Sequence, residues 1–240
     1  MLPLRTMFYG VIITIGSLIG GLMLGLMIGS LVFEVVSGHN FQSLDPVHVL
    51  LAGIPALAGF FIGGAVWGVL MGRLAGATNR RRLAVAGALG FAPITIGLAM
   101  LLQVIEPIAL EKFGAVIPLH RLFTLLFVPT AFLITGVSTW ALGIGLHDKA
   151  VAKSLWWRAG LGAAVAFLVI DFGMESAGWV VGAPRAAERF TMLTVLFTSN
   201  LGAAIVGGAV VGTGLARRHG DAHLSVLRHP GENGDAIAAG

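Results

Sequence analysis

Two acidic residues stand one helical turn apart inside a long apolar stretch of this sequence. Asp171 and Glu175 lie within residues 159–182, where every other residue except Ser176 is apolar or glycine. Residues four apart share one face of an α-helix. A charged side chain at the centre of a membrane-spanning helix costs about 2.5–3.5 kcal/mol on the insertion scale, so such groups need partners, water or a function to be retained. The pair therefore predicts a titratable centre that relays protons or binds a cation.

A structural role is the alternative for the same two residues. Hydrogen bonds from hydroxyl or amide groups on neighbouring helices would satisfy the carboxyl groups and set the relative positions of those helices. The candidate partners are Thr95, Gln103, Thr194, Thr198, Ser199 and Asn200. We favour the functional interpretation, because ionisable residues inside membranes mark functional sites by default.

Other polar residues gather near the predicted outer ends of the apolar stretches. Glu34, Glu106 and His48 are placed at an outer mouth that would feed the acidic centre. Asp45 and His48 have the i, i+3 spacing that a divalent metal could use, although Asp45 also suits a helix N-cap. His48 and His120 both begin apolar stretches, so ligation of a b-type haem is a third hypothesis.

The composition decides the class of protein. Of 240 residues, 57% are hydrophobic and only 11% are charged, whereas soluble domains average about 25% charged residues. Mean hydropathy is +0.93. We predict an all-α polytopic membrane protein, a bundle of six transmembrane helices within 1–218, followed by a disordered cytoplasmic tail over 219–240. The predicted spans are 7–36, 47–74, 83–105, 121–146, 159–182 and 190–215.

Positive charge indicates the orientation of the bundle. The chain has 15 Lys and Arg residues, and most fall on one side of the predicted membrane together with both termini. Lysine and arginine are enriched in cytoplasmic loops, so both termini are expected in the cytoplasm. We therefore expect a multi-pass protein of the bacterial inner membrane. The basic residues predicted to lie outside are Lys112, Arg121, Arg185 and Arg189.

Glycine is unusually frequent, at 35 residues, and it is patterned in the first span. Small residues at spacings of four allow close approach of helix backbones, so helix packing is favoured over a pore lined by glycine carbonyls. The tetrapeptide Gly-Gly-Ala-Val also occurs twice, at 63–66 and 207–210, which suggests duplication of a helical hairpin or a coincidence of composition. The glycines of the first span are Gly16, Gly20, Gly21, Gly25 and Gly29.

Several function classes are excluded or disfavoured. With no cysteine, the chain cannot form disulfides, thiolate metal sites or iron–sulfur clusters. No hydrolase, metalloprotease or nucleotide-binding motif is present, so we expect neither an enzyme nor a cofactor, and the basic loops indicate lipid rather than nucleic acid. The leading hypothesis is a small transport protein that moves a proton, a cation or a small solute. The alternative is a non-catalytic structural or anchor subunit of a larger membrane complex, and a homo-oligomer is compatible with either.

Overall fold

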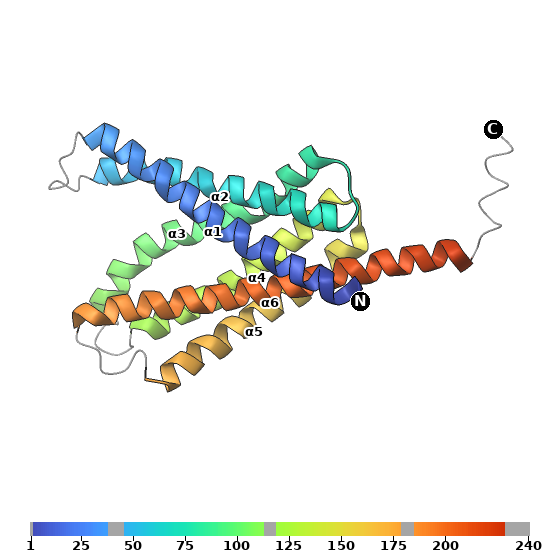
Figure 1. Ribbon diagram of the computed structural model, residues 1–240. Coiled ribbons are helices and arrows are strands. Elements are labelled where there is room, and N and C mark those ends of the chain that lie inside the picture. The colour runs from blue at the N-terminus through green and yellow to red at the C-terminus, as the bar shows by residue number, and fades with distance from the viewer. Residues whose placement is uncertain (1, 38–45, 113–118, 179–184, 229–240) are drawn as a thin grey trace.

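The computed structural model describes residues 2–37, 46–112, 119–178 and 185–228, and all of its regular structure there is α-helical. The all-α prediction is therefore confirmed for these residues. Figure 1 shows how the helices are arranged, and α6 extends past the others at its C-terminal end. The helices are α1 (Leu2–Ser37), α2 (Pro46–Leu74), α3 (Arg80–Lys112), α4 (Leu119–Gly145), α5 (Lys149–Ser176) and α6 (Arg185–Arg228).

Four of the helices are long and apolar enough to cross a membrane, which identifies a membrane-embedded protein. In α2 the described apolar helix, Ala58–Leu74, is shorter. The number of six spans and the side of the membrane that holds the termini stay predictions. The four candidate spans are Leu4–Val32, Phe123–Gly145, Lys149–Ser176 and Thr194–Arg217.

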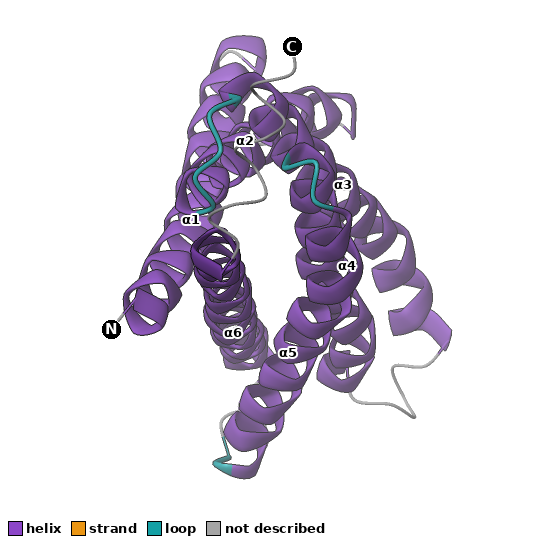
Figure 2. Ribbon diagram, turned by 90° about the vertical axis from the view of Figure 1, so that its right-hand side faces the viewer, coloured by secondary structure: helices purple, strands orange, loops and turns teal. Residues whose placement is uncertain are grey.

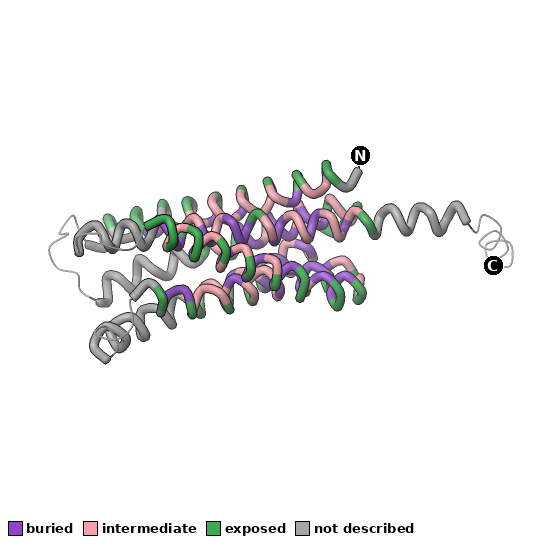
Figure 3. Tube along the Cα trace, turned by 90° about the horizontal axis from the view of Figure 1, so that it is seen from below, coloured by how far each residue is buried: buried purple, intermediate pink, exposed green. Residues whose placement is uncertain are grey.

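The helices form a closed ring. Each helix packs against its neighbours in the sequence, and α1 packs against α6, whereas contacts across the ring are sparse. Figure 2 shows the helices arranged around a common axis. Buried residues lie where the helices face one another, and exposed ones lie on the outside (Figure 3). The outward side chains include large apolar ones such as Leu125, Val169 and Phe172, as expected where lipid is the solvent.

Glycine brings α1 and α2 into backbone contact. Gly21 and Gly25 of α1 lie against Gly59 and Gly63 of α2. A Cβ atom added at Gly63 would lie 2.7 Å from the carbonyl oxygen of Ser17 and 3.0 Å from the Cα atom of Gly21. No side chain fits at this crossing, so the two helices meet through their backbones.

Both Gly-Gly-Ala-Val segments also allow helix backbones to touch, at other crossings of the ring. A Cβ atom at Gly64 would lie 2.7 Å from the carbonyl oxygen of Gly87 in α3, and one at Gly208 would lie 2.7 Å from that of Gly10 in α1. Gly136 stands midway between Gly64 and Gly208 in the sequence, and it approaches α5 in the same manner. Each even-numbered helix thus uses one of these glycines to contact the next helix around the ring.

The glycines of α1 divide between two faces. Gly21, Gly25 and Gly29 are buried, as predicted for packing residues. Gly16 and Gly20 are exposed, and a Cβ atom at either would meet nothing within 4 Å. Consecutive helical residues differ by about 100° in direction, so Gly20 and Gly21 cannot both face α2.

The end of α6 differs from the prediction. The helix continues through 219–228 to Arg228, where a disordered segment was expected from residue 219 onward. Ala222, Leu224 and Leu227 are good helix formers, and the first proline after the membrane segment is Pro230. The break in hydrophobic pattern at 219 therefore marks the end of the apolar stretch and not of the helix. Residues 229–240 lie outside the described residues.

Replacing Gly87 by alanine is expected to destabilise the ring. The new methyl group would collide with the carbonyl oxygen of Gly64 and the Cα atom of Gly68. Overpacking of this kind costs about 1–3 kcal/mol of the free energy of unfolding. Gly97→Ala in the same helix is the matched control, because nothing lies within 4 Å of its Cβ position. Unfolding of both variants in mixed detergent micelles, followed by circular dichroism, compares them; equal stabilities would contradict this account of the crossing.

Candidate functional site

Asp171 lies in the interface between α4 and α5. It is 4% exposed, and its Oδ2 atom accepts a hydrogen bond of 2.7 Å from the hydroxyl of Thr124 in α4. Thr124 was not among the partners expected from the sequence. The contact is of the kind that a structural role predicts, because the donor comes from the neighbouring helix.

Glu175 makes a second contact to α4, one turn further along α5. Its Oε1 atom lies 3.2 Å from Nη2 of Arg121. The Arg121 side chain is 62% exposed and the Glu175 side chain 15% exposed, so this ion pair stands at the margin of the bundle. Partly exposed pairs contribute only about 0–1 kcal/mol.

The antiparallel helices α4 and α5 make further side-chain contacts in line with these two. Phe127 and Phe167 stack with their ring centroids 6.1 Å apart, and Phe132 meets Trp156 edge to face at 5.8 Å. The residue numbers of the partners rise in α4 as they fall in α5, which is one continuous register. The geometry therefore gives Asp171 a part in aligning α4 with α5. A functional role for the acidic pair stays a prediction.

The expected outer mouth lies mostly outside what the structure describes. Glu34 is exposed near the end of α1. His48 falls on α2, Glu106 on α3 and His120 on α4, but their side chains lie outside the described residues, as does Asp45. The haem and metal hypotheses consequently rest on the sequence alone. Among the described residues no three His, Asp or Glu side chains gather as a metal site would require.

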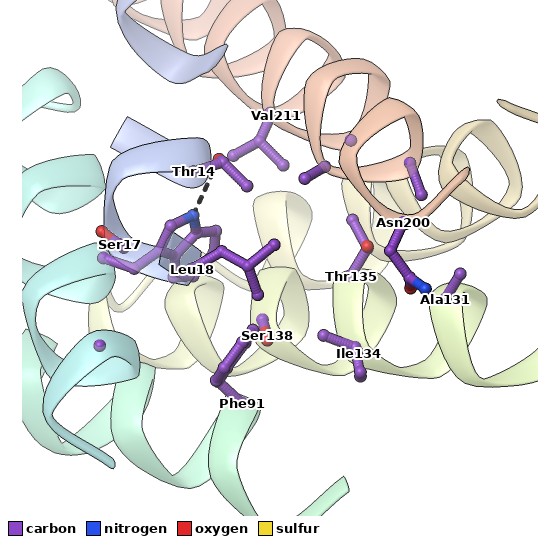
Figure 4. Close-up of a pocket in the computed structure, with 16 residues that line it drawn as sticks. Thr14, Ser17, Leu18, Phe91, Ala131, Ile134, Thr135, Ser138, Asn200 and Val211 are labelled. Atoms are coloured by element: carbon purple, nitrogen blue, oxygen red, sulfur yellow. Dashed lines mark hydrogen bonds between the residues drawn. The ribbon is translucent and has the colours of Figure 1, made fainter. Parts of the chain in front are cut away.

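The ring encloses a central cavity of about 80 Å³, halfway along its helices. Figure 4 shows side chains from α1, α4 and α6 around it. This volume has room for several water molecules or one small solute. Among the residues that the structure describes, no charged one lines it, and none of α5 does. The lining residues are Thr14, Ser17, Leu18, Gly63, Trp67, Phe91, Ala131, Ile134, Thr135, Ser138, Asn200, Ala203, Ala204, Gly207, Gly208 and Val211.

Some polar groups of the cavity wall are satisfied within the protein. The indole Nε1 of Trp67 donates to the hydroxyl of Thr14 at 3.1 Å, a contact that links α2 to α1 (Figure 4). The Nδ2 atom of Asn200 donates to the carbonyl oxygen of Leu196 at 2.8 Å, one turn back in α6. These groups give the wall a fixed shape.

Two hydroxyl groups of the wall are not satisfied. Ser17 is 7% exposed and Ser138 is 3% exposed, and neither Oγ atom has a hydrogen-bond partner in the described part of the chain. Burial of an unpaired hydroxyl costs about 1–3 kcal/mol, so a partner is needed there. Other helical hydroxyls bond to the carbonyl four residues earlier, namely those of Thr14, Thr95, Thr130, Thr139, Ser154, Ser176, Thr198 and Thr213.

This cavity was not foreseen from the sequence. Ser17 and Ser138 are single serines in apolar stretches, a pattern that equally suits a helix-packing contact. The two serines line the same cavity only because the ring brings α1 and α4 to opposite sides of it. The arrangement can donate and accept hydrogen bonds, and its described lining residues include no carboxyl, imidazole or amine that could serve as a general base.

Comparison with protein-family models, curated proteins and solved structures gives no match to this chain.

A double-mutant cycle between Asp171 and Thr124 tests the alignment role. Asp171→Asn keeps an acceptor oxygen and should cost less than about 1 kcal/mol of unfolding free energy, whereas Asp171→Leu removes the acceptor of Thr124 and should cost about 1–3 kcal/mol. Combined with Thr124→Val, Asp171→Leu should show a coupling energy of about 0.5–3 kcal/mol. Additive effects in detergent unfolding would show that the contact does not hold α4 to α5.

Proposed function

We propose that this chain is a small transport protein of the bacterial inner membrane whose substrate passes through the central cavity. The observation that carries the proposal is the pair of buried hydroxyls, Ser17 and Ser138, that lack partners in a cavity halfway along the helices. A polar solute in transit would supply the missing hydrogen bonds. Each bond formed there offsets part of the free energy of leaving water.

The chemistry of the wall selects an uncharged solute. Transfer of an isolated ion into an apolar medium costs far more than hydroxyl groups can return, and the lining offers no counter-charge. Hydroxyl and amide side chains suit small alcohols or amides of a few heavy atoms. Trp67 and Phe91 supply apolar surface for the carbon skeleton of such a molecule.

In this proposal Asp171 and Glu175 are not the titratable transport centre that the sequence predicts. Asp171 does not line the cavity, and its carboxylate is engaged by Thr124. A path for protons or cations would need this group to reach water along the transport route. Transport of a neutral solute does not, so Asp171 and Glu175 serve to align α4 with α5.

A structural or anchor subunit of a larger complex is the second candidate. The exposed Gly16 and Gly20 favour it, because a helix of another chain could approach α1 closely on that face. The same face would serve a homo-oligomer. A subunit role leaves the unpaired hydroxyls of the cavity without an explanation, which is why transport is preferred.

Solute flux into proteoliposomes tests the transport proposal. Swelling of vesicles in glycerol or urea, followed by light scattering, should be faster with the protein than without it. Ser17→Ala and Ser138→Ala should each lower the flux by about five-fold, because one hydrogen bond of about 1 kcal/mol is lost in the passage. Ala204→Leu adds three carbons to the cavity wall and should abolish the flux.

Ser199→Ala is the matched control for the serine variants. The Ser199 hydroxyl is likewise fully buried, without a partner among the described residues, but it does not line the cavity. Its flux should equal that of the wild type. Flux that survives Ala204→Leu, or that falls only when Asp171 is neutralised to Asn, would refute passage through the cavity.

A further inference from the structure

Two grooves lie side by side on the outer surface of the ring at its basic end, the end formed by loops 75–79 and 146–148. The first groove runs between α3 and α4 and has a volume of about 550 Å³. The second runs between α4 and α5 and has a volume of about 440 Å³. Trp140 and Ile144 of α4, together with Arg82 of α3, border both grooves and form the ridge that separates them.

The first groove changes character along its length. Arg81 and Arg82 stand at its mouth, and Val85, Leu89 and Val137 line it further in. From Arg81 to Leu89 the helix rises about 12 Å, at about 1.5 Å per residue. A cationic mouth above an apolar channel of this length matches a phospholipid, whose phosphate would lie at the mouth and whose acyl chain would follow the channel.

The second groove repeats the cationic mouth. Lys149 and Lys153 of α5 line it, together with His147, and the rings of Trp140 and Trp156 lie along its walls. The one acidic residue in its lining, Asp148, caps α5 by accepting hydrogen bonds from the backbone N–H groups of Ala150 and Val151. Arg82, Lys149 and Lys153 against Asp148 leave the described lining with a net charge of +2, three positive charges less one negative. Amphipathic aromatic rings at this depth are typical of the headgroup boundary.

Arg82 is held between the two mouths. Its Nη2 atom donates a hydrogen bond of 2.8 Å to the carbonyl oxygen of Ile144, which keeps the guanidinium on the ridge. The remaining N–H groups can serve a phosphate from either side, and arginine is well suited to phosphate oxygens. One cation thus belongs to both grooves.

We propose that this double groove is a binding site for an anionic phospholipid of the leaflet at the basic end. The phosphate contacts Arg81, Arg82 and Lys153, and the acyl chains occupy the grooves on both sides of the Trp140–Ile144 ridge. Basic pockets between membrane helices are a known means of binding anionic headgroups. The site is independent of the central cavity, because no residue lines both.

Quenching of tryptophan fluorescence by brominated lipid tests the proposal. The full chain in mild detergent is titrated with phosphatidylglycerol or phosphatidylcholine that carry the same brominated acyl chains. Brominated phosphatidylglycerol should reach half-maximal quenching at a several-fold lower mole fraction. The double substitution Trp140→Phe and Trp156→Phe should remove most of this preferential quenching, because these two rings line the grooves.

Charge variants separate the site from general surface attraction. Arg81 and Lys153 are exposed, so Arg81→Gln and Lys153→Gln should fold normally and together lower the preference for phosphatidylglycerol at least three-fold. Arg73→Gln and Arg217→Gln remove exposed cations outside the grooves and should leave it unchanged. Equal quenching by both lipids, an equal loss in the control variants, or a protein dimer that shields Trp140 from both lipids would overturn the proposal.

Discussion

The closure of the ring through glycine is the constraint on which the other features depend. Lipid tails are as apolar as leucine side chains, so the hydrophobic effect does not drive membrane helices together. Close packing must do so, and at the crossings of α1 with α2 and of α2 with α3 the backbones touch without intervening side chains. The contact of Gly208 and Gly212 in α6 with Gly10 in α1 then joins the last helix to the first. Six helices held in this way surround a space that none of them fills.

The polar groups in this apolar setting fall into three classes according to their hydrogen-bond partners. Most helical hydroxyls return to a carbonyl of their own helix, as Thr139 does with Thr135. Asp171 takes its hydrogen bond from a neighbouring helix and so helps to align α4 with α5. Ser17, Ser138 and Ser199 follow neither course among the described residues, and the first two face the cavity. Transport of a neutral solute is proposed because it supplies partners for the two hydroxyls of the cavity wall.

The two proposed sites, the central cavity and the outer grooves, differ in charge. The cavity lies inside the ring and is lined by five of the helices with no charged side chain among the described residues, whereas the grooves are cationic at their mouths and lie on the outer surface. Helix α4 has a part in both, since Ser138 and Thr135 line the cavity while Trp140 and Ile144 border the grooves. Neighbouring residues of one helix point in different directions, so the C-terminal half of α4 contributes some side chains to the interior site and others to the surface site.

The amino-acid sequence alone determined the class of protein, the approximate positions of the helices and the presence of glycine-mediated packing. Those conclusions depend on local properties: the length of apolar runs, the distribution of charge and the spacing of small residues. The acidic pair was found in the same way, since 171 and 175 share a helix face, but its partner on α4 was not. Thr124 lies far from Asp171 in the sequence, and only the antiparallel register of α4 and α5 brings them together. Ser17 and Ser138 required still more, because a cavity exists only once the ring is closed. A hydrogen-bond requirement can be read from one residue, but the identity of the group that meets it is decided by the packing of distant segments.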